Sequence, residues 1–187
     1  MDEYKILEDS VRNTFGSVVW SHKIQEKQAD LYFSQYKFME TAKIVAASLT
    51  SVGIVSLLFT DQMWIKILSA VISFISVFIS AFFKSFDLQT LVSSHNSSAQ
   101  KLLAIRDDLK ILLLMIHLQQ KSVNELIVQY KKVNETLHDV YAEAPRTTDK
   151  AVQEARIALN ITQDNVFSDK EINCNLPETL HRRRENE

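Results

Sequence analysis

The chain has 187 residues, of which 21 are basic and 23 acidic, so its net charge is −2. This balance argues against nucleic acid as the main partner, because nucleic-acid-binding domains normally carry a basic face. Only two glycines and two prolines occur, which leaves little room for the tight turns of sheets or for glycine-rich phosphate loops. The single cysteine, Cys174, provides no disulfide framework and fits a reducing compartment. The composition predicts an all-α protein built from long helices.

The N-terminal arm, residues 1–43, contains no proline and has the charged composition of an exposed helix. Ile24, Leu31 and Phe38 recur along it at intervals of seven residues. Such an interval places side chains on one face of a helix. We therefore expect an apolar line along this arm.

Two charge-free apolar runs follow, at residues 44–60 and 67–83. At ~1.5 Å per residue each run spans roughly 25 Å, slightly less than the ~30 Å hydrocarbon core of a bilayer. Lysine side chains can extend to the lipid headgroups and tryptophan favours the interface, which closes the difference. The expected interface anchors are Lys43, Trp64, Lys66 and Lys84. A buried hairpin in a soluble bundle is the alternative, but so short a chain could hardly cover two helices that are apolar all round. We predict a two-transmembrane hairpin over residues 44–86.

The distribution of lysines predicts how the hairpin is oriented. Lys66 alone lies between the two runs, whereas the other nearby basic residues lie on the side that both termini share: Lys23, Lys27, Lys37, Lys43, Lys84 and Lys101. Basic residues concentrate on the cytoplasmic side of membrane proteins. We therefore expect a multi-pass membrane protein with both termini in the cytoplasm.

The second run carries a hydroxyl group on almost every turn of one face, at Ser69, Ser73, Ser76 and Ser80. Small residues allow helices to approach closely in lipid, and serine can bond to its own helix. The first run offers a matching set of small residues at Ala46, Thr50, Gly53 and Thr60. The serines therefore either pack against a neighbouring helix or line a polar path in an assembled oligomer, and both alternatives stand.

The region 87–143 is predicted to form one long cytoplasmic helix with a heptad seam. The polar stretch 88–98 either continues this helix or marks a joint capped by Asn96 or Ser97. The seam positions alternate at spacings of three and four, with Gln119 as the one polar member. Its apolar members are Leu102, Ile105, Leu109, Leu112, Ile116, Val123, Leu126, Tyr130, Val133, Leu137 and Val140. Such a seam must be buried, either against a second copy as an oligomerisation surface or against the N-terminal arm lying antiparallel to it. Gln119 either sets the register or is solvated.

Residues 144–187 are expected to form a short helix within 148–165 and a flexible tail. The tail holds the basic cluster 182–184, which is either a solvated terminus or a contact for anionic lipid or nucleotide phosphate. The whole sequence contains no glycine-rich phosphate loop, no paired Cys-x-x-Cys and no nucleophile elbow. Glu135 and His138 have the spacing of half a bundle metal site, but the companion carboxylates are missing. We predict no enzymatic activity, no cofactor and no metal.

The layout resembles the SLATT family, the SMODS- and SLOG-associating two-transmembrane effectors. The resemblance covers about residues 8–143 and rests on the arm with Trp20-Ser-His-Lys23 and Glu26, the two apolar runs, and the long helical region behind them. It implies an anti-phage effector, encoded beside a nucleotide synthase, a nucleotide sensor or a reverse transcriptase, that assembles as a homo-oligomer in lipid and permeabilises or depolarises the inner membrane. It implies no catalytic residues. A membrane-anchored coiled-coil scaffold that conducts nothing is the alternative.

Overall fold

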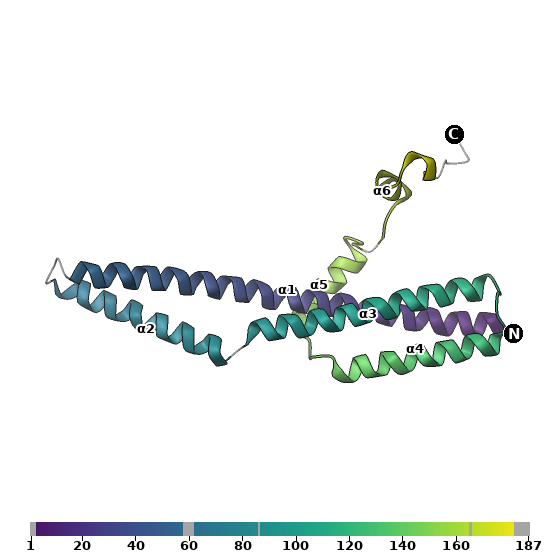
Figure 1. Ribbon diagram of the computed structural model, residues 1–187, viewed down its shortest axis with the longest axis horizontal. Coiled ribbons are helices and arrows are strands. Elements are labelled where there is room, and N and C mark those ends of the chain that lie inside the picture. The colour runs from purple at the N-terminus through teal and green to yellow at the C-terminus, as the bar shows by residue number, and fades with distance from the viewer. Residues whose placement is uncertain (1–2, 58–61, 86, 165, 182–187) are drawn as a thin grey trace.

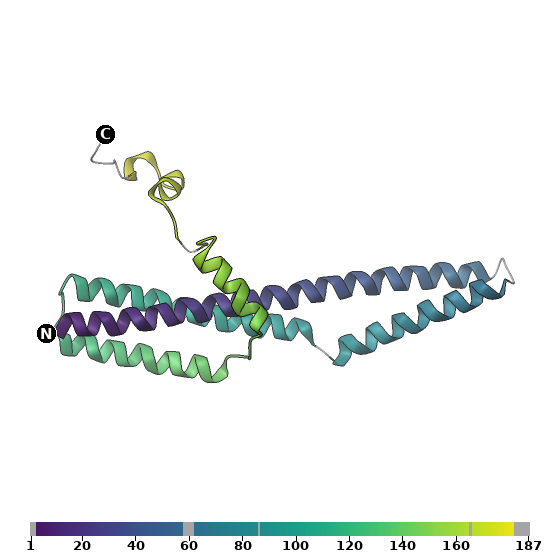
Figure 2. The same ribbon diagram turned by 180° about the vertical axis from the view of Figure 1, so that it is seen from behind.

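The computed structural model describes residues 3–57, 62–85, 87–164 and 166–181. Within these ranges the chain is all-α, as the composition predicted, and contains no strand. Figure 1 shows an elongated molecule with a helical bundle at the end that holds the N-terminus and a two-helix hairpin at the other end. A C-terminal arm leaves the long axis near the middle (Figures 1 and 2).

One helix, α1 (Glu3–Leu57), runs through both the bundle and the hairpin. Its 55 residues correspond to about 80 Å at ~1.5 Å per residue. Proline is absent from it, and its two glycines, Gly16 and Gly53, have ordinary negative φ. The N-terminal arm and the described part of the first apolar run are therefore one continuous helix.

Helix α2 (Met63–Ser85) lies antiparallel beside the second half of α1 (Figures 1 and 2). The chain then enters α3 (Leu88–His117), which Asp87 caps by accepting hydrogen bonds from the backbone N–H of Thr90 at 3.0 Å and from its hydroxyl at 2.5 Å. These bonds hold the pKa of the Asp87 carboxyl below its usual value. Residues 93–98 lie inside α3, so a joint capped by Asn96 or Ser97 is wrong, and the break falls before Leu88 instead.

The prediction of one long helix through the heptad seam is also wrong. Helix α3 ends at His117, and α4 (Val123–Glu143) runs back antiparallel to it (Figure 1). Gln119 lies in the turn, exposed and with a φ of 49°, as the solvated alternative had it. Ser122 and Glu125 form a reciprocal capping box that starts α4. Hydroxyl and carboxylate together satisfy two free backbone N–H groups there, which favours a new helix over continuation of the old one.

The seam forms the core of a three-helix bundle of α1, α3 and α4. Eight of its apolar members are buried and Val123, Tyr130 and Val133 pack against them, together with Leu7, Val11 and Val18 of α1. Of the two predicted partners, the structure therefore shows the N-terminal arm. Phe38 is 76% exposed, so the line through Ile24, Leu31 and Phe38 is not the packing face of that arm. A role of the seam in oligomerisation would require this bundle to open.

Hydrogen bonds of tyrosine hydroxyls connect the helices at several points along the bundle. Tyr4 donates to the carbonyl of Lys121 at 3.1 Å, and Tyr130 lies 2.7 Å from the hydroxyl of Thr14. Tyr141 lies 3.0 Å from the hydroxyl of Ser21. Each bond joins α1 to α4 or to the turn before it, so these bonds hold α4 against α1.

The C-terminal arm begins with α5 (Asp149–Asn160), within the segment expected to be helical. Three alanines, Ala151, Ala155 and Ala158, form its buried face against α1. Two short elements follow, α6 (Asp169–Cys174) and η1 (Glu178–Leu180), and extend away from the bundle (Figure 2). The basic cluster 182–184 lies outside the described residues.

Candidate functional site

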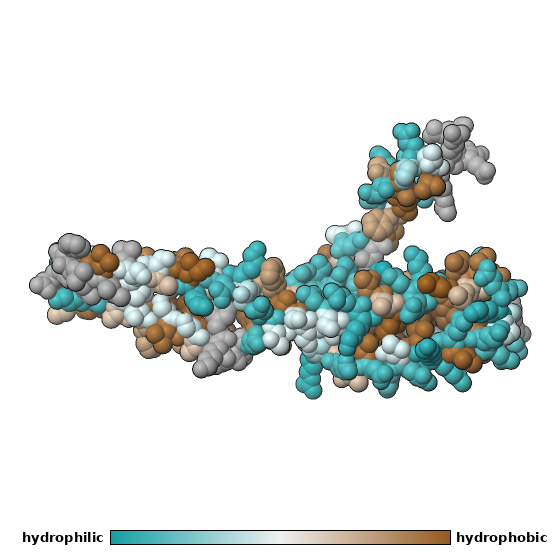
Figure 3. Space-filling model, in the orientation of Figure 1, coloured by the Kyte–Doolittle hydropathy of each residue, from teal (hydrophilic) through white to brown (hydrophobic). Residues whose placement is uncertain are grey.

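The hairpin presents a long apolar surface that none of the described residues covers. The segment Met63–Phe82 of α2 is long and apolar enough to cross a membrane, and no residue in it is buried. Phe74 is 74% exposed and Phe78 64% exposed. Figure 3 shows the contrast, with few hydrophilic residues over the hairpin and many over the bundle. Among the described residues this is the one helical segment with these properties; of the first run, residues 44–57 lie on α1, and 58–60 lie outside the described ranges.

The serine stripe of α2 faces α1 at two of its four positions. Ser76 lies 3.4 Å from Thr50, hydroxyl to hydroxyl. At Gly53 a Cβ atom would stand only 2.6 Å from the Ser69 hydroxyl, so the two helices approach closely there. Ser73 is half-buried, whereas Ser80 is exposed and donates to the carbonyl of Ser76. These contacts support the packing alternative for Ser69 and Ser76. Thr60, the last small residue of the first run, lies outside the described residues.

The expected interface anchors lie at the two ends of the hairpin. Trp64 is 62% exposed and its indole N–H donates to the side-chain carbonyl of Gln62 at 2.6 Å. Lys66 is exposed on the next turn. At the opposite end Lys43 pairs with Glu40 at 3.7 Å. The side chain of Lys84 lies outside the described part of the structure.

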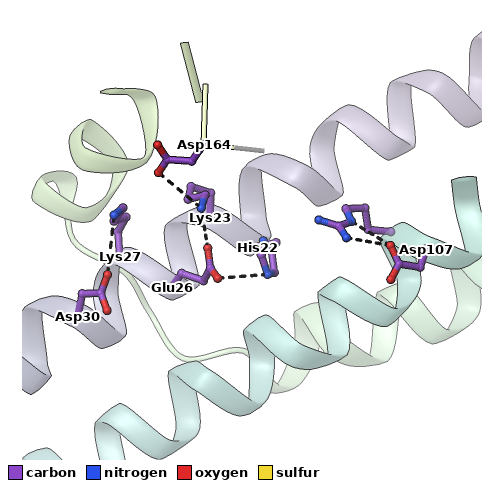
Figure 4. A network of polar contacts seen from close by, with 8 residues as sticks. His22, Lys23, Glu26, Lys27, Asp30, Asp107 and Asp164 are labelled. Atoms are coloured by element: carbon purple, nitrogen blue, oxygen red, sulfur yellow. Dashed lines mark hydrogen bonds and ion pairs between the residues drawn. The ribbon is translucent and has the colours of Figure 1, made fainter. Parts of the chain in front are cut away.

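A buried polar cluster lies where α5 packs against α1, and it contains His22 and Lys23 of the Trp20-Ser-His-Lys23 motif. Figure 4 shows Lys23 between two carboxylates, with Nζ 2.8 Å from Glu26 and 3.9 Å from Asp164. The ring of His22 reaches Glu26 at 3.7 Å. Both His22 and Lys23 are buried. The motif thus links α1 to the turn that follows α5.

Two buried glutamines of α1 complete this cluster. Gln25 accepts from Nδ1 of His95 on α3 at 2.5 Å and donates to the carbonyl of Pro145 at 3.3 Å. These bonds require the proton of His95 to sit on Nδ1. Gln28 accepts from both the backbone N–H and the hydroxyl of Thr148, each at 2.8 Å. Since Thr148 caps α5, one side chain of α1 fixes where α5 begins.

Burial governs the protonation of both histidines. Loss of water lowers the pKa of His22, which outweighs the opposing effect of Glu26, and the charges of Arg106 and Lys23 lower it further. Burial also lowers the pKa of His95. Both rings are therefore neutral at pH 7. Nδ1 of His22 is the one buried side-chain nitrogen or oxygen that lacks a hydrogen bond among the residues that the structure describes.

The cluster joins α1 to α3 and to the segments that flank α5. Within the described residues no three His, Cys, Asp or Glu side chains gather as a metal site would require. The contact between His22 and Glu26 was predictable from the sequence, because residues four apart on a helix are neighbours. Gln25, Gln28 and His95 were missed, because their partners lie 70 to 120 residues away in sequence and no local pattern marks such pairs.

These features define a membrane-associated, all-helical protein in which a sealed bundle is joined to an uncovered apolar helix. Residues 7–171 match the family model described as SMODS and SLOG-associating 2TM effector domain family 4, SLATT_4. The match covers most of the chain, so the protein belongs to this family. Membership implies a membrane effector associated with anti-phage defence and a genetic link to SMODS or SLOG systems. No curated protein and no solved structure matches the chain.

The family match also corrects the extent of the resemblance. The common core was expected to end near residue 143, but the match continues to 171 and includes α5. This extension agrees with the structure, in which Gln25, Gln28 and Lys23 tie α5 and its flanking turns to α1. Helix α5 is part of the domain and not an appendage.

Proposed function

We propose that this chain is a bacterial inner-membrane effector of anti-phage defence that permeabilises or depolarises the membrane on a cytoplasmic cue. Residues 44–60 and 67–83 form its two spans, and both termini lie in the cytoplasm. The cue comes from a genetically linked nucleotide synthase, nucleotide sensor or reverse transcriptase. The chain binds lipid and other copies of itself and needs no cofactor.

The observation that carries this proposal is the uncovered apolar surface of α2, in a member of a two-transmembrane effector family. A soluble protein would have to bury a helix of this kind. Trp64 and Lys43 lie at opposite ends of the hairpin, where the two lipid–water interfaces would be. The bundle supplies the cytoplasmic part, since its surface is rich in hydrophilic residues (Figure 3).

Permeabilisation requires several copies, because two helices cannot enclose a water-filled path in lipid. The serine stripe supplies polar groups for such a path. At rest Ser69 and Ser76 pack against α1. A rotation or separation of α1 and α2 would turn them toward the interior of an assembly, next to Ser80. We expect replacement of all four serines by leucine to reduce ion leakage or change its selectivity, and unchanged leakage would remove the stripe from the path.

The direct test is induced expression in cells that carry a membrane-potential dye, with the linked partner present. An active effector should collapse the potential, and the purified chain should release an encapsulated dye from liposomes once its partner activates it. A membrane-anchored scaffold would leave both the potential and the liposomes intact. That outcome would replace the proposal with the scaffold alternative.

A further inference from the structure

A charge-free hollow lies between α1 and α3 on the side of the bundle that faces the hairpin. Its volume is about 430 Å³. We call its main lining residues the neutral patch: Phe33, Tyr36, Gln89, Ser93, Asn96 and Gln100. All of them are exposed except Tyr36, which is half-buried. The neutral patch includes Gln89, Ser93 and Asn96 of the polar stretch 88–98, whose side chains have no role in the fold described above.

The absence of charge distinguishes this hollow from two other hollows of the bundle. The hollow at the far end of α1 and α3 is lined by Glu8, Arg12 and Lys110. The hollow between α3 and α4 contains Asp108 and Lys132. By contrast, the stretches 31–36 and 88–100 contain no Asp, Glu, Lys or Arg, and their only histidine, His95, is buried and neutral. Lys37, above the ring of Phe33 at 5.6 Å, marks one border.

Three amide side chains of the neutral patch have hydrogen-bonding capacity that the described part of the chain does not use. Within the described residues, the side chains of Gln89, Asn96 and Gln100 make no hydrogen bond. Side-chain amides and hydroxyls both donate and accept. A surface of such groups is complementary to an identical surface, whereas a charged surface repels its own copy.

The spacing of these residues fits a helix as the occupant. Gln89, Ser93, Asn96 and Gln100 follow one another at intervals of four, three and four along α3. This is the spacing with which helices pair side by side, and amides at such positions fix the alignment of paired helices. Copies of one membrane protein share the same orientation, so their α3 helices stand parallel at the same distance from the lipid.

We propose that the neutral patch is the surface through which a second copy of this chain docks, α3 against α3, on the cytoplasmic side next to the membrane. The proposal rests on the assembly of copies in the proposed function and identifies the contact. It also explains why this face carries amides and hydroxyls, while the next turns of α3 carry Lys101, Arg106 and Asp107. The apolar seam remains sealed inside each copy.

Single cysteines test this contact in native membranes. The background is the full chain with Cys174→Ser, because Cys174 is exposed. Ser93→Cys is a nearly isosteric change in the neutral patch, and Gln153→Cys on the exposed face of α5 is the control. With a short bis-maleimide we expect several-fold more covalent dimer from Ser93→Cys than from Gln153→Cys. Equal yields would overturn the proposal.

A charge introduced into the neutral patch tests the same contact independently. Asn96→Lys places like charges across the contact and should lower the cross-linking of Ser93→Cys to the level of the control, whereas Asn96→Gln keeps an amide and should preserve it. Unchanged cross-linking in Asn96→Lys would contradict docking through this patch. The circular dichroism spectrum and melting temperature of each purified variant verify that the bundle is folded.

The same membranes separate this proposal from the proposed function. Cross-linking through Ser93→Cys without any loss of membrane potential would support the docking surface and reject permeabilisation. Loss of potential with no preferential cross-linking at Ser93→Cys would support permeabilisation and reject the docking surface.

Discussion

The bundle and the hairpin share helix α1 and differ in almost everything that surrounds it. In the bundle α1 buries Leu7, Val11 and Val18 against α3 and α4 and forms hydrogen bonds to helices distant in sequence. In the hairpin the described part of α1 pairs with α2, with small residues between the two and exposed apolar side chains on the outer face. The bundle buries its apolar side chains within the chain, whereas the hairpin leaves an apolar face exposed. A continuous helix joins them, so a displacement of α1 in the bundle reaches the hairpin directly.

The largest expected effect comes from removing a core side chain of the bundle. Leu109 is fully buried in α3, and its replacement by alanine should lower the free energy of unfolding by about 2–5 kcal/mol. Leu114→Ala is the matched control, because Leu114 lies on the same helix and is 57% exposed. Chemical denaturation of the purified chain in detergent measures both. If both variants lost the same free energy of unfolding, the heptad seam would not form the core of the bundle.

A smaller effect is expected at the contact between α1 and α5. Gln28→Ala leaves the N–H and hydroxyl of Thr148 without their acceptor, which should cost about 1–3 kcal/mol. The loss should be local, because α5 buries only alanines. Hydrogen exchange should therefore accelerate in α5 and hardly change in α3. Gln35→Ala, an exposed site on the same helix, should alter neither, and equal protection of α5 in both variants would rule out the role of Gln28.

In the hairpin the close approach at Gly53 allows a weaker test. A Cβ there meets the Ser69 hydroxyl oxygen at 2.6 Å and Cβ at 3.2 Å. Because the hydroxyl can rotate away, Gly53→Ala should weaken the pairing of α1 with α2 by only about 1 kcal/mol. Ser69→Ala in the same chain should restore part of the loss, measured as thermal stability in detergent. If the double variant has the same melting temperature as Gly53→Ala alone, positions 53 and 69 are not in contact.

The smallest effect is a pH dependence that only the bundle should show. Burial holds the pKa of His22 and His95 below the ordinary histidine value of 6.5, so the unfolded chain binds more protons than the folded one just below that pH. The free energy of unfolding should then fall as the pH is lowered from about 7 to 5. Glu125 and Glu143 have lowered pKa values and lose their contribution only in more acidic solution. Replacing both histidines by glutamine should make the free energy of unfolding nearly independent of pH over this range. An unchanged pH dependence would show that other groups cause it.

The sequence predicted the helices well and their breaks poorly. The seam is in phase on both sides of the turn at 118–122, so its periodicity alone suggested one helix. The signal that marks the turn is local: Ser122 followed by Glu125, a capping box. Asp87 marks the other break as a simple N-cap, since its carboxylate accepts from the backbone N–H and the hydroxyl of Thr90 ahead of the serine-rich stretch.

For the functional site, the sequence predicted which segments are apolar or rich in small residues, but not which distant side chains contact one another. The uncovered face of α2 follows from its apolar run, and the contact of Ser69 with Gly53 agrees with the small residues on both runs. The cluster of Gln25, Gln28 and His95 depends on how α3 and α5 lie across α1. Contacts of that sequence separation arise from tertiary packing, which periodicity does not encode.

The central claim is that α1 passes from an aqueous bundle into lipid, and substituted-cysteine labelling tests it most directly. In the Cys174→Ser chain, Asn13→Cys, Ser48→Cys and Gln62→Cys each place a thiol at an exposed position of the isolated molecule. A membrane-impermeant maleimide should label Gln62→Cys in intact spheroplasts and Asn13→Cys only after lysis, whereas Ser48→Cys should stay protected in both, because lipid would cover it. Labelling of Ser48→Cys as readily as Asn13→Cys after lysis would contradict the account.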